Sequence, residues 1–316
     1  MTDPHALSRA AAVCRHPSVA LVLGGGGARG LAHILMIEAL DELGVRPQLI
    51  AGTSIGAVFG WAAASGISSR YMRAHALEVL GGRFDMIQTV LASSSEPLFR
   101  LLTLSRSALL KADRLLDLVM PTAASESFAE LIIPLKVVAT DFYGQSEVIL
   151  ESGSCRDAVA ASIALPAVFK PVLREGRALM DGGLVNPLPF DTVCGLADLT
   201  IAIDVTGGPL KAPHRDHPAP MEALFASFNI LERTIIQEKL RSRAPDILIS
   251  PDLDRFRVLD FHKAAEILEA AKPAKEQLKR ALSSRLDGRP SGPTGAVEVP
   301  ADSVQSAIRS HQRGHA

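Results

Sequence analysis

Residues 19–30 read VALVLGGGGARG. The first five form an unbroken apolar run, which is the pattern of a short strand buried on both faces of a parallel sheet. Four glycines end the run, and over residues 31–43 apolar residues recur at helical spacing until Gly44 and Pro47 supply a stop. This stretch predicts a strand, a glycine-rich turn and a helix, which is how an α/β fold opens.

The same order of elements repeats along the chain. Residues 48–51 are expected to form a second strand, and residues 55–64 a second helix. Asp113 is expected to be the N-cap of a helix over 114–120, and Pro273 to separate a helix over 263–271 from a last piece ending near Leu282. The other expected elements are strands at 135–140, 146–150, 178–180, 199–205 and 247–249, and a long amphipathic helix at 221–243.

Composition excludes several classes of protein. The chain has 316 residues, with 33 lysines and arginines against 34 aspartates and glutamates, so its net charge of −1 lacks the electrostatic footprint of a nucleic-acid binder. Hydrophobic residues make up 47% of the chain, which favours a globular core over disorder. No apolar run approaches the roughly 18 residues of a membrane-spanning helix, although contact with a membrane surface stays open.

Cysteine content and the two ends of the chain bear on location and domain organisation. Cys14, Cys155 and Cys194 are too few and too scattered for a disulfide framework or a metal site, which favours a cytoplasmic protein. Residues 1–17 lack a signal-peptide core and are expected to form a flexible arm. Residues 18–284 would be one folded domain, and residues 285–316, rich in Gly, Pro and Ser, are expected to be disordered.

The glycine-rich turn fits two different functions. Gly25, Gly27 and Gly30 match the G-x-G-x-x-G fingerprint of dinucleotide-binding proteins, in the strand-turn-helix context that it requires. Such proteins place an acidic residue about 20 residues further on to bind the ribose. No acidic residue lies between Glu42 and Glu78, which argues against a nicotinamide- or flavin-dependent oxidoreductase.

A second motif follows the second expected strand. Residues 52–56 read GTSIG, which matches the G-x-S-x-G nucleophile elbow between a strand and a helix. Gly52 and Gly56 would leave room for a strained turn that presents the Ser54 hydroxyl. The plainer interpretation of Ser54 is a helix N-cap. The glycine-rich turn nearby favours catalysis, because its unobstructed backbone N–H groups could hold an oxyanion.

A serine nucleophile needs a base, and Asp181 is the better candidate. It ends an apolar run and is followed by Gly182 and Gly183, so its carboxylate would be presented at a strand end without bulk around it. Burial there would raise its pKa and make it a stronger base. Spacing alone favours the other interpretation of Asp181, as a turn-forming residue in an Asp-Gly hairpin turn.

Histidine provides the alternative base. His214 and His217 follow Asp181 and Asp204 in the chain order of an α/β-hydrolase triad, and His262 is a further option. Such hydrolases usually place the elbow after several strands, whereas here it follows the second.

Four blocks of sequence resemble the patatin-like phospholipases, in the bacterial branch that is similar to the catalytic domain of neuropathy target esterase. They read GGGGARG, GTSIG, ASIALPAVFKP and DGGLVNPLP at residues 24–30, 52–56, 161–171 and 181–189. The likeness covers about residues 19–205, and more loosely 256–271. It implies a three-layer α/β/α fold with a mainly parallel central sheet and a catalytic domain over residues 18–284.

The resemblance also implies the residues of the site. Ser54 would be the nucleophile and Asp181 its base, without a histidine, acting on a lipid ester with neither metal nor cofactor. Arg29 would lie beside the oxyanion hole, in contact with phosphate or in a salt bridge. The hole itself would be formed by backbone N–H groups of Gly24, Gly25, Gly26, Gly27 and Ala28, with Gly52, Gly56, Gly182 and Gly183 in support and Asn186, Pro187 and Pro189 shaping the nearby loop.

Two further interpretations concern membranes and partners. Residues 97–112 hold Arg100, Arg106 and Lys111 without an acidic residue, so they could form a lid or touch anionic lipid on the inner face of a membrane. A buried helix with basic ends is the competing interpretation. A catalytically silent member that binds lipid or protein on the same fold also stays open, and the sequence names no protein partner.

Overall fold

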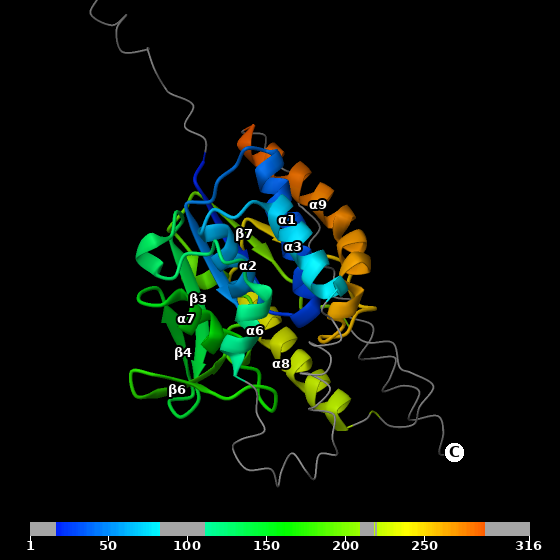
Figure 1. Ribbon diagram of the computed structural model, residues 1–316. Coiled ribbons are helices and arrows are strands. Elements are labelled where there is room, and N and C mark those ends of the chain that lie inside the picture. The colour runs from blue at the N-terminus through cyan, green and yellow to red at the C-terminus, as the bar shows by residue number, and fades with distance from the viewer. Residues whose placement is uncertain (1–16, 83–110, 209–217, 219, 288–316) are drawn as a thin grey trace, which may run out of the picture.

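The computed structural model describes residues 17–82, 111–208, 218 and 220–287 (Figure 1). Most of the expected N-terminal arm and C-terminal tail, residues 97–110 of the basic segment, and His214 and His217 lie outside the described residues. Within them, no helix combines the length and the apolar character that crossing a membrane requires.

A mainly parallel sheet forms the centre of the molecule, as the sequence predicts. Its strands lie in the order β5-β6-β3-β2-β1-β7-β8, and β4 pairs with β3 off this path. The pairs β3-β2, β2-β1, β1-β7 and β7-β8 are parallel, while β4 and β6 run antiparallel to β3. The strand bounds are β1 Val19–Leu23, β2 Leu49–Thr53, β3 Leu135–Asp141, β4 Ser146–Leu150, β5 Val172–Arg174, β6 Arg177–Asp181, β7 Leu199–Ile203 and β8 Ile247–Ile249.

Strand β1 is apolar throughout because helices and loops cover both of its faces. All five of its residues are buried, and it pairs with β2 on one side and β7 on the other. Leu21 and Leu23 belong to the larger hydrophobic core, while Ala20 and Val22 belong to the smaller one on the opposite face. Successive side chains of a strand point to opposite faces, so a run without polar residues is what such a position requires.

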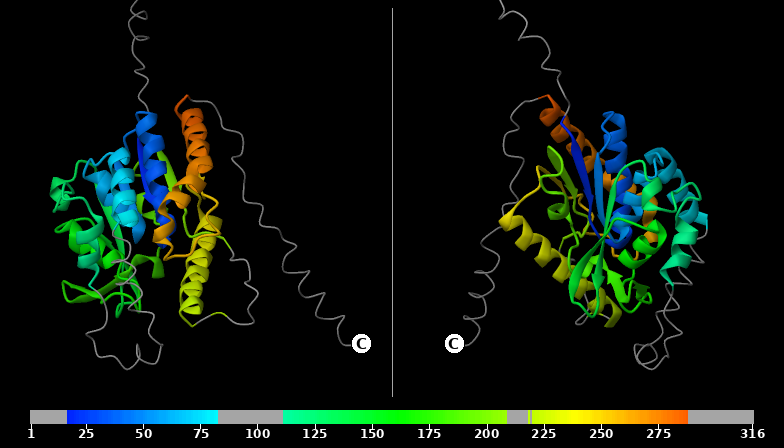
Figure 2. Two further views of the ribbon diagram at one scale, coloured as in Figure 1. Left: turned by 45° about the vertical axis from the view of Figure 1, so that its right-hand side comes forward. Right: turned by 90° about the vertical axis from the view of Figure 1, so that its left-hand side faces the viewer.

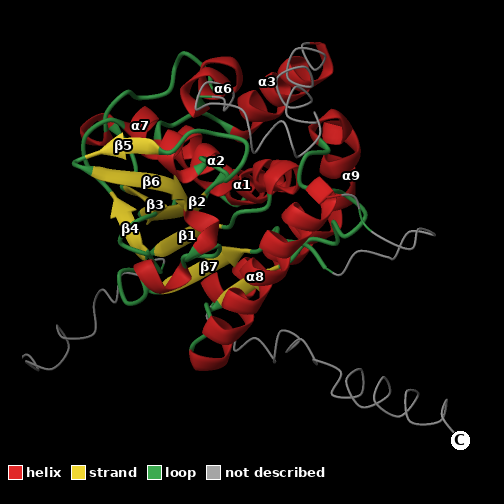
Figure 3. Cartoon of the chain, turned by 90° about the horizontal axis from the view of Figure 1, so that it is seen from below, coloured by secondary structure: helices red, strands yellow, loops and turns green. Residues whose placement is uncertain are grey.

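Helices complete three layers, as Figure 3 shows, with α7, α2, α1 and α9 on one side of the sheet and α8 on the other. The second face is covered by α8 together with the short helix Phe190–Val193. The helix bounds are α1 Ala32–Glu42, α2 Ile55–Ala64, α3 Ser69–Gly82, α6 Ala112–Val119, α7 Cys155–Ser162, α8 Pro220–Ser242 and α9 Ala264–Leu286.

The predicted break at Pro273 is wrong, because α9 continues through it to Leu286. Figure 2 shows the helix beside α1, and its buried side chains explain why it continues. A proline in a helix interior costs about 3 kcal/mol, whereas each large apolar side chain that is buried contributes about 1.5–3 kcal/mol. The buried residues of α9 are Ala264, Ile267, Leu268, Ala271, Ala274, Leu278 and Leu282.

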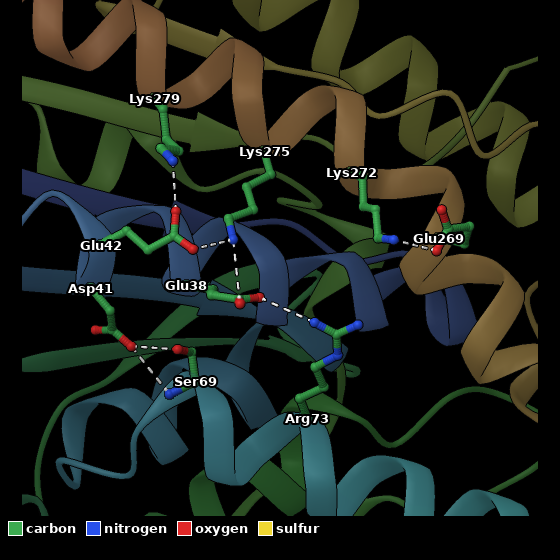
Figure 4. Close-up of polar contacts among 9 residues, drawn as sticks. All are labelled: Glu38, Asp41, Glu42, Ser69, Arg73, Glu269, Lys272, Lys275 and Lys279. Carbon is green, nitrogen blue, oxygen red and sulfur yellow. Dashed lines mark hydrogen bonds and ion pairs between the residues drawn. The ribbon is translucent and has the colours of Figure 1, made fainter.

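Charged contacts hold the same helix against α1. Glu42 accepts hydrogen bonds from Lys275, at 2.6 Å, and from Lys279, at 2.7 Å, and Lys275 also pairs with Glu38 at 3.3 Å (Figure 4). All three contacts come from lysines that follow Pro273 within the next two turns of the helix. They therefore hold α9 against α1 just beyond the proline, which has no N–H for the helix hydrogen-bond pattern.

Two smaller expectations also need correction. Helix α6 begins at Ala112 with Lys111 as its N-cap, so Asp113 lies in the first turn and is not the cap. In that position the carboxylate of Asp113 still interacts favourably with the positive end of the helix dipole. Strand β5, Val172–Arg174, is not predicted from the sequence because it has only three residues; it pairs with β6.

Candidate active site

Ser54 stands at a strained turn between β2 and α2. Its backbone has φ 53° and ψ −124°, a combination that costs on the order of 1–3 kcal/mol for a residue with a side chain. Two close approaches explain the flanking glycines. A β-carbon on Gly52 would lie 2.6 Å from the carbonyl oxygen of Gly56, and one on Gly56 would collide with the carbonyl of Leu23. The turn thus has the geometry of a nucleophile elbow.

Ser162 holds this turn in place. The backbone N–H of Ser54 donates to Ser162 Oγ at 2.8 Å, and that hydroxyl donates in turn to the carbonyl of Val138 at 2.6 Å. Ser162 is fully buried at the end of α7. Its role is not predicted from the sequence, although Ser162 lies in the block 161–171 that carries the family resemblance.

The hydroxyl of Ser54 points at Asp181. Ser54 Oγ donates to Asp181 Oδ2 at 2.7 Å, across 127 positions of sequence. Asp181 ends β6, where its other carboxylate oxygen accepts the N–H of Gly183 at 2.8 Å and its carbonyl accepts the hydroxyl of Thr140 at 2.7 Å. The chain then enters a short 3-10 turn, residues Gly182–Leu184, and not the hairpin turn that the alternative interpretation required.

Burial changes the basicity of Asp181. The residue is 4% exposed, and this desolvation raises the pKa of Asp181 to about 6, against the opposing effect of hydrogen bonds from Gly183 and Ser54. The carboxylate is therefore ionised near neutral pH and accepts a proton more readily than a free aspartate.

The glycine-rich turn contributes fewer free donors than predicted. The N–H of Gly24 donates to Ile203, that of Gly25 to Pro187 and that of Ala28 to Val258, all at 2.7–3.0 Å. Gly26 and Gly27 line the same cavity as Ser54. Among the described residues, the N–H groups of Gly24, Gly25 and Ala28 thus already have backbone acceptors, and Gly26 and Gly27 are the glycines of the turn that line the cavity.

Gly27 could not be another residue. Its φ is +58°, and a β-carbon there would collide with the carbonyl oxygen of Val258. The carbonyl oxygen of Val258 thus contacts the turn in two ways: it leaves no room for a side chain at Gly27, and it accepts the N–H of Ala28.

Two buried side chains form hydrogen bonds with backbone carbonyl groups of the glycine-rich turn. Arg29, 2% exposed, donates through Nε to the carbonyl of Gly26 at 3.3 Å. Nε2 of His33 is 2.9 Å from the carbonyl of Gly24, and complete burial lowers the pKa of His33 to about 4, so the ring is neutral. For Arg29, the sequence leaves both a phosphate contact and a salt bridge open.

The loop after Asp181 packs under the same turn. Thr53 Oγ1 donates to the carbonyl of Asn186 at 2.8 Å, and the side-chain amide of Asn186 donates to Glu147 at 2.6 Å and Asp191 at 3.1 Å. Pro187 accepts the N–H of Gly25. These contacts agree with the prediction that this block shapes a loop.

A cavity of about 170 Å³ opens onto Ser54 and Asp181. Its walls come from α2, α3, α6 and α8 and from the segment around Val258. Most of its lining is apolar, and Glu232 and Asn229 of α8 are polar exceptions. The aromatic lining residues are Phe59, Phe169, Phe225, Phe228 and Phe261. Glu232 is not predicted as a site residue, because no periodicity in the sequence distinguishes it from the other polar residues of α8.

Comparison with known proteins gives a consistent result. The sequence matches the family model described as patatin-like phospholipase over residues 21–193, more than half of the chain. An uncharacterized NTE family protein of Mycobacterium tuberculosis is 38% identical over 201 residues, covering 63% of this chain and 52% of that protein. Patatin-like phospholipase domain-containing protein 7 of Mus musculus is 32% identical over 293 residues, covering 84% of this chain and 21% of that protein.

A solved structure is also similar. The crystal structure of VipD from Legionella pneumophila aligns with a TM-score of 0.46 and 14% identity, over 84% of this chain and 67% of that one. The chain spans about half the length of the mycobacterial relatives.

Proposed function

The chain belongs to the patatin-like phospholipase family, and from that premise we propose that it is a serine-dependent lipid acyl hydrolase of the phospholipase A, lysophospholipase or carboxylesterase type. One observation carries the proposal: the 2.7 Å hydrogen bond from the hydroxyl of Ser54, on a strained turn, to the buried carboxylate of Asp181. A nucleophile in contact with its base, beside an apolar cavity, is the arrangement that acyl transfer through serine requires.

The first half of the reaction acylates Ser54. Its Oγ attacks the carbonyl carbon of the ester while the hydroxyl proton moves to Asp181 Oδ2. The N–H groups of Gly26 and Gly27 are the proposed donors to the oxyanion that forms. When the tetrahedral intermediate collapses, the C–O bond to the alcohol breaks, and Asp181 returns the proton to the departing alkoxide. The products are an alcohol and an acyl-serine.

The second half removes the acyl group. Water attacks the acyl-serine carbonyl and transfers a proton to Asp181, and the same two N–H groups stabilise the second oxyanion. Collapse of this intermediate breaks the bond to Ser54 Oγ, which recovers the proton from Asp181. A free fatty acid leaves, and the site returns to its starting state.

The cavity supports a lipid as the source of the acyl group. Its largely apolar walls, with five phenylalanine rings, suit a hydrocarbon chain, whose transfer from water contributes about 0.8 kcal/mol for each buried methylene. We assign the catalytic unit to residues 18–284 together with the last residues of α9, which carry the sheet, the site and the helices around the cavity.

Fatty-acid release tests this proposal. The wild type and Ser54→Ala would be incubated with a short p-nitrophenyl ester, a lysophospholipid and a diacyl phospholipid in mixed micelles. We expect the wild type to release acid from at least one lipid and Ser54→Ala to lose at least about 10³-fold in rate. If the folded wild type binds the micelles yet releases no acid, the chain is instead a binding module.

A further inference from the structure

A second carboxyl group lies beside Asp181. Glu232 belongs to α8 and lines the cavity together with Ser54 and Asp181. Along α8 it lies between Phe225, which packs against the larger core shared with α2, and Ile236, which belongs to the smaller core on the other face of the sheet. The helix is held there by Asn229, whose side-chain amide donates to the carbonyl of Thr206 at 2.7 Å. The reaction described above uses Asp181 but gives Glu232 no role.

Gly183 shows how close the two carboxyl groups are. A β-carbon built on Gly183 would lie 3.1 Å from Asp181 Oδ1, and it would be closer still to Glu232 Oε1. The two oxygens are therefore separated by less than twice that distance. Two ionised carboxylates at this separation in a buried site repel each other strongly, and one of them tends to keep its proton.

Hydrogen bonds decide which carboxyl is ionised. Asp181 accepts the N–H of Gly183 and the hydroxyl of Ser54, both of which stabilise its charged form. Among the described residues, Glu232 accepts no hydrogen bond from any group. The proton therefore belongs on Glu232.

The charges around Glu232 point the same way. Burial, together with the negative charges of Asp181 and Asp204, raises the pKa of Glu232 to about 8, against the opposing effect of Arg29. Asp204, at the end of β7, has its own donors in the N–H and hydroxyl of Thr206, at 2.9 and 2.7 Å. Arg29 is also shared with Asp204 and Asp254, so it does not neutralise Glu232 alone.

Building on the proposed hydrolase activity, we propose that Asp181 and Glu232 form a carboxyl pair that keeps one proton at neutral pH. The proton resides on Glu232, so that Asp181 stays ionised as the base of Ser54. Glu232 is thus a positioning residue that sets the charge of the site.

Ionisation of Glu232 at higher pH should slow the reaction. Its negative charge would offset the positive charge of Arg29, which donates a hydrogen bond to the carbonyl of Gly26. It would also repel the oxyanion that forms nearby and so destabilise the transition state. The pair therefore predicts two limbs in the pH profile of kcat/KM, a lower one from Asp181 and an upper one that begins near pH 8 and belongs to Glu232.

The test combines Glu232→Gln with a matched control, Glu238→Gln, which changes an exposed carboxylate of the same helix. In the wild type, kcat/KM for a short ester should decline above pH 8 toward a lower plateau as Glu232 ionises. Glu232→Gln should keep the lower limb and lose the upper one, and Glu238→Gln should keep both. An unchanged upper limb in Glu232→Gln would overturn the proposal, as would a uniform loss of rate that leaves the profile's shape intact.

Infrared spectroscopy of the full chain with ¹³C-carboxyl glutamate gives a readout that does not depend on activity or on any variant. At pH 7 the wild type should show the C=O band of a protonated glutamic acid, and this band should disappear above pH 8. The absence of the band at pH 7 would overturn the pair even if the enzyme is active. The presence of the band in a chain without hydrolase activity would support the pair and reject the proposed function.

Discussion

Ser54 and Asp181 share a 2.7 Å hydrogen bond although the strands that carry them, β2 and β6, are separated in the sheet by β3. The contact spans β3 because Ser54 directly follows the last residue of β2, and Asp181 is the last residue of β6, where it pairs with Ala139 of β3. Two buried hydroxyls fix its geometry: Thr140 of β3 donates to the carbonyl of Asp181, and Ser162 accepts the N–H of Ser54. A dyad of this kind depends on the loops and turns as much as on the sheet.

Acidification should reduce activity through the protonation of Asp181. Since its pKa is raised to about 6, kcat/KM should be level near neutral pH and fall about tenfold for each unit below pH 6. Measurement in added methanol identifies the group, because a lower dielectric raises the pKa of a carboxyl and leaves that of an imidazolium nearly unchanged. A limb that does not move in methanol would assign the base to a histidine.

Replacing Asp181 with Asn should remove activity and raise stability. In the native state Asp181 holds its proton up to about pH 6, whereas in the unfolded chain it loses it near 3.8, so the native state binds more protons in this window. Stability from this group is therefore lost as pH rises through the window. At pH 7 the free energy of unfolding of Asp181→Asn should exceed that of the wild type by on the order of 1–3 kcal/mol, so the variant should unfold at a higher urea concentration. Equal or lower stability at pH 7 would contradict the shifted pKa.

The glycine-rich turn can be tested with a matched pair of glycines. Gly27 and Gly44 have similar positive φ values, +58° and +65°, but only Gly44 has open space where a β-carbon would stand. Gly44→Ala should cost about 1 kcal/mol of stability without loss of activity. Gly27→Ala should also displace the turn and reduce kcat by about 10²-fold or more. Equal kcat values for the two variants would remove Gly27 from the oxyanion hole.

Ser162 should matter for both stability and rate. Ser162→Ala leaves the N–H of Ser54 without its acceptor in a buried site, which should cost about 1–3 kcal/mol in urea unfolding and lower kcat by loosening the elbow. Ser227→Ala is the control, since that exposed hydroxyl bonds only within its own helix and its loss should stay within about 0.5 kcal/mol. A Ser162→Ala enzyme with wild-type kcat would show that the turn at Ser54 keeps its catalytic geometry without the hydrogen bond to Ser162.

Much of the fold could be predicted because local sequence and global structure agree there. The run at β1 and the two glycine motifs that follow β1 and β2 specify a buried parallel strand and two tight turns, and the structure has them. Pro273 shows the limit. Its local preference favours a break, but the burial of Leu268 and Leu278 against the core favours a continuous helix, and only the three-dimensional contact decides.

The site residues also divide into those that the sequence identifies and those that only contacts distant in the chain reveal. Ser54 and Asp181 stand out in the sequence because their neighbours are glycines that the geometry requires. The donors of the glycine-rich turn could not be sorted from sequence, since their partners Ile203, Pro187 and Val258 are distant in the chain. Glu232 was invisible for the same reason, because a polar residue on an amphipathic helix is ordinarily solvated.

The central claim is that Asp181 activates Ser54, and intact mass after exposure to a fluorophosphonate probe tests it most directly. The wild type, Ser54→Ala and Asp181→Asn would be treated in parallel, with micelles present. The account predicts a single adduct on the wild type, none on Ser54→Ala and much slower labelling of Asp181→Asn. A folded wild type that takes up no adduct, or an adduct that persists in Ser54→Ala, would contradict it.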